Sequence, residues 1–332
     1  MSKPTERIIK TNDISLNVVE QGHGPLVLLC HGFPESWYSW RHQIAALAEA
    51  GFHAVAPDMR GYGKSDRPEA IDQYTIFHLV GDVVSLLDAF LTPSAFVVGH
   101  DWGASVAWQA ARLRPDRFRG VVNLSVPYRP RAPARPTTLM PQTADAQFYQ
   151  LYFQEPGVAE AELEKDPRLS LRTMLYGSSG EGAAAFRALV ASGRTAPSVG
   201  MVPRGSGLLR GTVEPPPLPP WLSEADIAFY AGEFERSGFR GPLNYYRNVD
   251  RNWELMAPFA DVRVNVPALY IAGNDDMVLA APGTAEHLAN LRQFVPALRD
   301  IRMLPGCGHW TQQERPAEVN AAIIEFLRSL PN

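Results

Sequence analysis

The sequence predicts an α/β protein in which helices flank a mostly parallel central sheet and a helical segment is inserted into the chain. Short apolar runs typical of strands alternate with helical patterns along most of the chain. This alternation stops between residues 128 and 246. In addition, the motif GHDWG at 99–103 joins a buried strand to a helix. We therefore expect a core made of residues 1–127 and 247–332, with residues 128–246 forming a helical cap.

The core elements are expected to begin with a hairpin that turns at Asn12 and Asp13, residue types that tolerate a tight hairpin backbone. Strands are predicted at 7–10, 14–20, 26–30, 53–56, 95–98, 121–124, 268–272 and 301–304, and helices at 37–50, 74–91, 104–113 and 316–330. Within the cap, helical patterns alternate with loops such as those at 177–180 and 215–220. Such an insertion would lie over the carboxyl ends of the strands, where open α/β sheets bind ligands.

Composition excludes several classes of protein. The 332 residues are 45% hydrophobic and 20% charged, with a net charge of −4, so a large core is expected and nucleic acid is not an expected partner. The sequence has no 18-residue apolar run and no apolar N-terminal signal, which predicts a cytoplasmic protein without a membrane partner. A monomer or homodimer is expected. Cys30 and Cys307 are expected to be buried free thiols rather than a disulfide.

The motif at 99–103 has an aspartate, Asp101, where many hydrolases carry a serine nucleophile. Its glycines suit a sharp strand-to-helix turn, because a Cβ there would collide with the neighbouring strand or helix. A carboxylate that attacks a saturated carbon forms an ester, which water can open, whereas a serine would form an ether. Asp101 therefore indicates substrates attacked at sp3 carbon, such as epoxides or alkyl halides. By itself, the motif is equally typical of an aspartate that only caps the following helix.

His309, in the motif GCGHWTQ at 306–312, is the candidate general base, since it follows the predicted strand at 301–304 and completes the chain order Asp, Asp, His. The acid that would hold its tautomer comes from GNDD at 273–276. Asp275 and Asp276 compete for this role. The Gly-x-x-Asp spacing favours Asp276 and leaves Asp275 as a loop-capping or solvent-facing residue. The remaining histidines without such context are expected at the surface or in the core: His23, His42, His53, His78 and His287.

The motif HGFP at 31–34 follows the predicted strand at 26–30. At this place a loop N–H and the N–H after the nucleophile can form an oxyanion hole, so Phe33 and Trp102 are the expected donors. Taken alone, HGFP is also consistent with a simple tight turn that contains Gly and Pro.

Four motifs make the chain resemble the epoxide hydrolases of the α/β-hydrolase fold: HGFPESWYSW at 31–40, DMRGYGKSD at 58–66, GHDWG at 99–103 and GCGHWTQ at 306–312. Within this family, the chain resembles the hydrolase domain of soluble epoxide hydrolase. Residues 149–163 and 237–248 look like the two tyrosine-bearing cap segments of that family, whereas the resemblance is weakest over 178–220. The family resemblance implies an α/β-hydrolase core with a helical cap, and it implies that the protein hydrolyses an epoxide to a vicinal diol.

Carried over position by position, the resemblance implies that Tyr149 and Tyr246 bind the epoxide oxygen. An acid is needed there because ring opening generates an alkoxide, and a phenol with a pKa of about 10 remains protonated at neutral pH. The residues alone do not select these two over the rival tyrosines: Tyr152, Tyr230 and Tyr245. The substrate pocket is expected to be lined by Phe33, Trp102, Gln150, Phe153, Val278 and Trp310.

The expected reaction has two halves. Asp101 first forms a hydroxyalkyl ester, and His309, oriented by Asp276, then activates the water that hydrolyses it. No metal or organic cofactor is expected, and the expected partner is a small-molecule epoxide. Two alternatives remain open. A haloalkane dehalogenase would carry Asn at the position of Phe33, and a fluoroacetate dehalogenase would carry Arg at that of Trp102. A non-catalytic binder on the same fold would retain the pocket without needing the triad.

Overall fold

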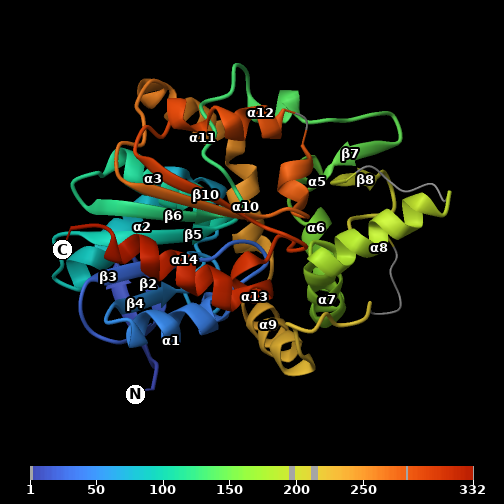
Figure 1. Ribbon diagram of the computed structural model, residues 1–332. Coiled ribbons are helices and arrows are strands. Elements are labelled where there is room, and N and C mark those ends of the chain that lie inside the picture. The colour runs from blue at the N-terminus through green and yellow to red at the C-terminus, as the bar shows by residue number, and fades with distance from the viewer. Residues whose placement is uncertain (1–2, 194–198, 211–215, 282, 332) are drawn as a thin grey trace.

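A central eight-stranded sheet with helices on both faces organises the computed structural model, which describes residues 3–193, 199–210, 216–281 and 283–331 (Figure 1). The strand order is β1-β2-β4-β3-β5-β6-β9-β10. Strand β2 is antiparallel to β1 and β4, and all other neighbours are parallel. The strands are β1 Thr5–Thr11, β2 Ile14–Gln21, β3 Leu26–Cys30, β4 His53–Pro57, β5 Ala95–His100, β6 Phe118–Leu124, β9 Ala268–Gly273 and β10 Leu298–Leu304. The predicted, mostly parallel sheet is confirmed.

The N-terminal hairpin turns where the sequence predicts. Asn12 and Asp13 have φ angles of 45° and 61°, and Thr11 pairs with Ile14 across the two-residue turn. Positive φ at both central residues matches the right-handed twist of the flanking strands, which explains why Asn and Asp stand there.

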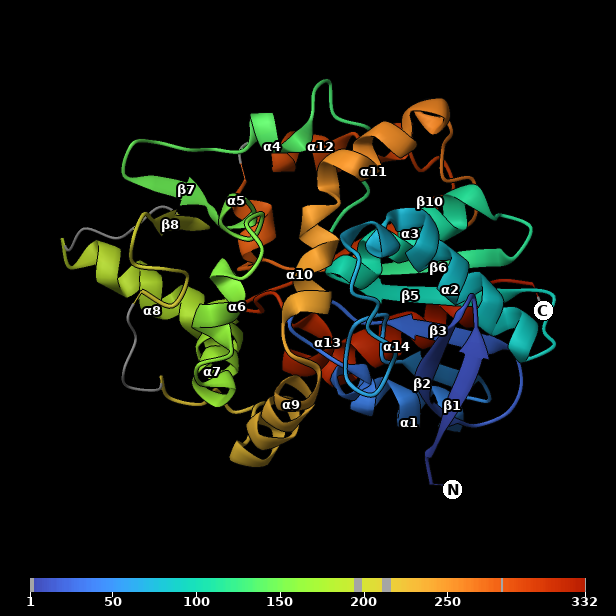
Figure 2. The same cartoon turned by 180° about the vertical axis from the view of Figure 1, so that it is seen from behind.

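Alternate residues of the central strands face two different helical layers. In β3, Leu28 packs in the apolar cluster that contains residues of α2 (Ile76–Ala89) and α3 (Trp102–Leu113). Its neighbour Leu29 packs with α1 (Arg41–Glu49) and α14 (Pro316–Arg328). Helices α1 and α14 lie in front of the sheet in Figure 1, and α2 and α3 lie in front of it in Figure 2. A parallel sheet covered on both faces needs apolar residues at every position, which accounts for the continuous apolar runs in the sequence.

The predicted core helices are present with shifted ends: α1 Arg41–Glu49, α2 Ile76–Ala89, α3 Trp102–Leu113 and α14 Pro316–Arg328. Two short core helices, α12 Thr284–Ala289 and α13 Thr311–Glu314, were not predicted. The helix expected at 37–50 is divided, because a 3-10 turn over Trp37–Trp40 precedes α1. The helix expected at 74–91 is shorter than predicted. Thr75 is extended and Leu91 has a φ of 52°, so neither belongs to α2.

The long insertion leaves the sheet after β6 and returns at β9, and these two strands are neighbours. Its helices are α4 Pro136–Leu139, α5 Tyr149–Tyr152, α6 Val158–Leu163, α7 Pro167–Gly177, α8 Gly180–Ala191, α9 Glu224–Ser237, α10 Arg240–Arg247 and α11 Val249–Leu255. A small sheet of β7 (Ala146–Phe148) and β8 (Met201–Pro203) was not expected, since three-residue strands are too short to show an alternating pattern. The division at residue 246 stays a prediction, and it falls within α10.

Three further expectations concern single features. Residues 194–198 and 211–215 of the divergent stretch, including the start of the loop expected at 215–220, lie outside the described residues. Within the described ranges, no helix has both the length and the apolar character that a membrane span requires. Cys30 and Cys307 are both free and buried, and burial raises the pKa of both thiols.

Candidate active site

Asp101 lies at the turn between β5 and α3, with a φ of 53° and a ψ of −117°. A non-glycine residue rarely adopts a positive φ, and such strain is typical of a nucleophile elbow. The glycines make the turn possible: a Cβ on Gly103 would lie 1.9 Å from the carbonyl oxygen of Cys30, and one on Gly99 would lie 2.2 Å from that of Gly103. The Asp101 side chain forms no capping hydrogen bond to α3, so the structure contradicts the helix-cap alternative.

Replacing Gly103 with alanine should destabilise the protein by about 1–3 kcal/mol or more, because the backbone of two packed elements would have to separate. The free energy of unfolding in urea measures this loss. A matched control is Gly232→Ala in α9, where a Cβ meets no atom within 4 Å and where alanine should stabilise the helix by up to about 1 kcal/mol. Equal stability of the two variants would contradict the close packing at the elbow.

The expected oxyanion donors lie beside the nucleophile. The Phe33 N–H donates to Asp101 Oδ1 at 2.8 Å. Trp102 is the first residue of α3, so its N–H has no acceptor within the helix. The HGFP motif is therefore more than a tight turn, since it places a backbone donor on the elbow carboxylate. A Cβ on Gly32 would lie 2.3 Å from Asp101 Cβ, which explains the glycine before Phe33.

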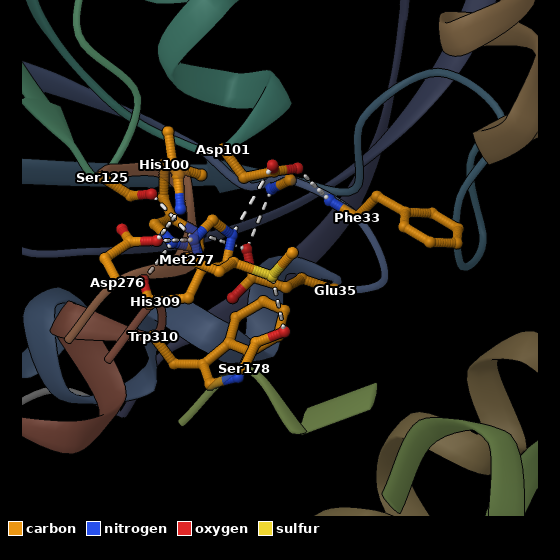
Figure 3. Close-up of polar contacts among 12 residues, drawn as sticks. Phe33, Glu35, His100, Asp101, Ser125, Ser178, Asp276, Met277, His309 and Trp310 are labelled. Atoms are coloured by element: carbon orange, nitrogen blue, oxygen red, sulfur yellow. Dashed lines mark hydrogen bonds and ion pairs between the residues drawn. The ribbon is translucent and has the colours of Figure 1, made fainter. Parts of the chain in front are cut away.

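His309 lies between two carboxylates (Figure 3). Its Nδ1 is 3.0 Å from Asp276 Oδ1, and its Nε2 is 3.6 Å from Asp101 Oδ2. The Asp276 side chain is fully buried, whereas that of Asp101 is 14% exposed. The buried acid therefore contacts one ring nitrogen, and the accessible carboxylate faces the other. The structure thus brings together the three residues that the motifs select from separate parts of the chain.

These contacts shift the pKa values of His309 and Asp276. Burial disfavours the imidazolium form of His309, but the charges of Asp276 and Asp101 outweigh it and raise the pKa of His309 well above its usual range. Burial likewise disfavours the ionised form of Asp276, and the charge and hydrogen bond of His309 outweigh it, so the pKa of Asp276 is lowered. Both acids therefore favour the protonated form of His309.

The neighbouring acid, Asp275, has a different partner. Its carboxylate forms a two-pronged ion pair with Arg187 of α8, with nitrogen-to-oxygen distances of 2.7 and 3.1 Å. The expectation that Asp275 caps its loop or simply faces solvent is therefore wrong, because it binds the insertion. This contact depends on the tertiary placement of α8 and has no local sequence signal.

Ser125 is a site residue that sequence reasoning missed. It directly follows β6, has a φ of 69°, and places its Oγ 2.8 Å from His309 Nδ1. It therefore shares that ring nitrogen with Asp276 (Figure 3). Its position at the carboxyl end of a parallel strand is the signal that could have identified it, because ligands of open α/β sheets gather at that edge.

Glu35 and His100 form a second, fully buried pair that the sequence did not single out. Glu35 Oε2 is 2.7 Å from His100 Nδ1 and accepts the Gly32 N–H at 2.9 Å. His100 Nε2 donates to the carbonyl oxygen of His309 at 2.8 Å. The pair thus connects the HGFP loop, the elbow and the loop of His309. Both residues belong to motifs that the sequence analysis quoted, but their contact spans 65 positions.

The two tyrosines implied by the resemblance converge on the elbow from the insertion. Tyr149 follows β7 and Tyr246 lies in α10, and their ring centroids are 6.0 Å apart. The Tyr149 hydroxyl accepts a hydrogen bond from Gln150 Nε2 at 3.0 Å, which leaves its proton free to point elsewhere. Burial, reinforced by the charge of Asp101, raises the pKa of both phenols, so both remain protonated at neutral pH.

The rival tyrosines are bound elsewhere. The hydroxyl of Tyr152 donates to Glu162, that of Tyr230 to Gln313 and that of Tyr245 to the carbonyl oxygen of Arg60, over 2.8 to 3.0 Å. None of the three is among the described residues that line the cavity at the elbow. Geometry therefore favours Tyr149 and Tyr246, where local sequence could not decide.

A cavity of about 670 Å³ lies between the sheet and the insertion. Its lining includes the triad and both tyrosines together with most of the expected pocket residues, namely Phe33, Phe153, Val278 and Trp310. Trp102 and Gln150 are not among the described lining residues. Each contacts a lining tyrosine instead: the Trp102 ring lies 5.1 Å from that of Tyr246, and Gln150 binds Tyr149. The rest of the lining is mainly apolar and includes Met174, Phe186, Met201, Leu208 and Met277.

The fold and the site define a hydrolase of the α/β class, and comparison with known proteins agrees. Residues 25–316 match the family model described as alpha/beta hydrolase fold. "Epoxide hydrolase A" of Mycobacterium tuberculosis is 47% identical to this chain, over 99% of both proteins. The "Bifunctional epoxide hydrolase 2" of Sus scrofa is 41% identical, over 95% of this chain and 54% of that protein.

Solved structures show the same likeness. An epoxide hydrolase from an endophytic Streptomyces superposes with a TM-score of 0.90 at 43% identity, over 99% of this chain and 96% of that one. Epoxide Hydrolase A from Mycobacterium thermoresistibile has a TM-score of 0.88 at 46% identity, over 99% of both chains. This chain therefore belongs to the epoxide hydrolases of the α/β-hydrolase family.

Proposed function

We propose that this protein hydrolyses epoxides to vicinal diols through a covalent ester on Asp101. One observation carries the proposal: two buried, protonated phenols, Tyr149 and Tyr246, line the same cavity as the nucleophile and His309. The family relationship supports it. The substrate would be a small-molecule epoxide with an apolar substituent, since the remaining lining is largely apolar.

In the first half-reaction, a carboxylate oxygen of Asp101 attacks an epoxide carbon and forms a carbon–oxygen bond. The ring bond between that carbon and the epoxide oxygen breaks, and its electron pair goes to the oxygen. Tyr149 and Tyr246 bind the oxygen, and one of them supplies its proton. The product is a hydroxyalkyl ester and a tyrosinate.

In the second half-reaction, His309 takes a proton from water, and the resulting hydroxide attacks the ester carbonyl. The Phe33 and Trp102 N–H groups stabilise the oxyanion. The alcohol then leaves as the diol, Asp101 is regenerated as a carboxylate, and the proton released in this hydrolysis stays on His309.

The charge of Asp101 connects the two half-reactions through the pKa of His309. The negative charge of Asp101 is one of the causes that raise the pKa of His309. Esterification removes this charge, so the pKa of His309 falls after the first step and the imidazole becomes available as a base. The proton that His309 loses at this point passes to the tyrosinate, so the tyrosine is restored and His309 enters the second half-reaction as a neutral base.

The alternatives predict different donors. A dehalogenase needs groups that bind a leaving halide, and the chain carries Phe33 and Trp102 where the two dehalogenase types would carry Asn or Arg. A non-catalytic binder would not need the arrangement of His309 between two carboxylates.

The direct test is turnover of styrene oxide by the purified protein, followed by diol formation, with a haloalkane assayed in parallel for halide release. Diol without halide is the expected result. Halide release without diol would establish the dehalogenase, and binding without either product would establish the binder. A panel of terminal, trans-disubstituted and fatty-acid epoxides would then define the substrate.

The cytoplasmic location and the monomeric or homodimeric state expected from the sequence stay predictions.

Asp276→Asn should lower turnover by orders of magnitude, up to about 10⁴-fold, because an amide no longer fixes the tautomer of His309 or stabilises its imidazolium. Asp275→Asn is the matched control, since it removes a neighbouring charge whose partner, Arg187, is half exposed. This change should alter turnover little, as expected for a solvent-screened pair. Stopped-flow rates of ester hydrolysis measure both variants, and the reverse ranking would assign the orienting role to Asp275.

A further inference from the structure

The loop that carries His309 is held by a carboxylate outside the triad. Glu314, at the end of α13, accepts three backbone N–H groups: Gly308 and Gly180 donate to its Oε2 at 2.8 and 3.0 Å, and Trp310 donates to its Oε1 at 3.0 Å. Two of these donors flank His309 in the chain. The third, Gly180, is the first residue of α8 in the insertion.

The insertion binds the remaining amide of this loop. The N–H of His309 donates to the carbonyl oxygen of Ser178 at 2.8 Å, and the ring N–H of Trp310 donates to that of Leu175 at 2.8 Å. The backbones are also in close contact, because a Cβ on Gly308 would lie 2.4 Å from the nitrogen of Gly180. The three successive amides at 308–310 are therefore all bound either by Glu314 or by the insertion.

An acceptor that receives three N–H groups has to be a carboxylate. An ionised glutamate offers two oxygens and no donor, whereas an amide of the same shape would turn an NH2 group toward an N–H. Burial raises the pKa of Glu314, with the charge of Glu181 adding to it, while the three N–H bonds favour the anion. Removing the carboxylate would therefore leave at least one buried amide unpaired.

We propose that Glu314 is a positioning residue for His309, which it holds in register with the nucleophile by fastening the histidine loop to the insertion. This inference rests on the proposed function. His309 acts on water in the second half-reaction, so displacement of its loop should affect ester hydrolysis more than ester formation. A misplacement of about 1 Å can cost about 10²-fold in rate.

The test is Glu314→Gln, with single-turnover kinetics that measure ester formation and ester hydrolysis separately. Hydrolysis of the ester should slow by about 10- to 10²-fold, and formation of the ester much less. Because the slowed step follows ester formation, kcat and KM should fall together while kcat/KM changes little. A purely structural loss of folded enzyme would instead lower kcat and kcat/KM equally and leave KM unchanged. That outcome, or a hydrolysis rate equal to that of the wild type, would overturn the proposal.

Two further variants complete the experiment. Glu318→Gln is the matched control, because it removes the same charge from the exposed surface of the adjacent helix α14; both rates should remain at the wild-type level. Glu314→Asp retains the charge with a shorter side chain and should hydrolyse the ester faster than Glu314→Gln. If the glutamine variant fails to fold, the aspartate variant alone decides, since selective slowing of hydrolysis supports positioning and equal slowing of both steps contradicts it. Absence of any ester in the wild-type protein would count against the proposed function instead.

Discussion

Replacement of His309 with glutamine is expected to arrest the protein as a stable ester of Asp101. Glutamine cannot take a proton from water, so hydrolysis should become too slow to follow, whereas alkylation needs only the carboxylate and the cap tyrosines. Intact-protein mass spectrometry after addition of styrene oxide should show an increase of one substrate mass. Peptide mapping should place this increase on the segment that contains Asp101.

The double variant Asp101→Ala/His309→Gln is the control for this experiment. It retains the cavity and both tyrosines but has no nucleophile, so its mass should not change. An unmodified mass of the single variant under conditions where the epoxide is shown to bind would exclude the covalent mechanism. A mass increase in both variants would indicate alkylation elsewhere on the chain.

Loss of both cap hydroxyls should nearly abolish ester formation. Tyr149→Phe and Tyr246→Phe should each slow alkylation by about 10- to 10⁴-fold, the usual range for a positioned acid. The oxygen needs a proton when the ring opens and not when the ester is hydrolysed. Hydrolysis of any ester that does form should therefore be much less affected. Rapid-quench measurement of ester formation in a single turnover gives the relevant rate.

Tyr152→Phe provides a matched control in the same helix as Tyr149. Its hydroxyl donates to Glu162 and is not part of the described cavity lining, so its removal should leave alkylation near the wild-type rate. Alkylation at the wild-type rate in the Tyr149→Phe/Tyr246→Phe variant would show that these tyrosines only pack. The epoxide assignment would then lose its main distinction from dehalogenation.

The sheet could be predicted from sequence because its strands are buried on both faces and are separated by helices with a distinct period. The predicted ends of the helices and strands were less accurate than their existence. Thr75 and Leu91 have helix-compatible sequence context but adopt backbone conformations that end α2. The short pair β7 and β8 could not be predicted, since its strands are held by their partner and carry no pattern of their own.

The site residues also fall into two groups, those that local motifs indicate and those that only the folded structure identifies. Asp101, Phe33 and His309 lie in motifs whose local backbone is unusual, so the sequence itself indicates them. Ser125 and Glu35 act through contacts with residues far away in the chain, at His309 and His100. Local reasoning has no access to such pairings. For the same reason, local sequence does not select Tyr149 and Tyr246, which the family resemblance implies and which both line the cavity.

The insertion begins and ends on the neighbouring strands β6 and β9, and this adjacency affects how the protein can evolve and be engineered. Because the two strands are parallel, the segment leaves β6 at the carboxyl edge of the sheet and enters β9 at the opposite edge. The part of it that covers the carboxyl edge can therefore be lengthened, shortened or exchanged without changing the order or register of any strand. Substrate preference can therefore diverge by replacement of this segment while the hydrolytic core is inherited unchanged. A graft would need to keep the short stretch at 175–180 that meets the histidine loop, together with the two tyrosines.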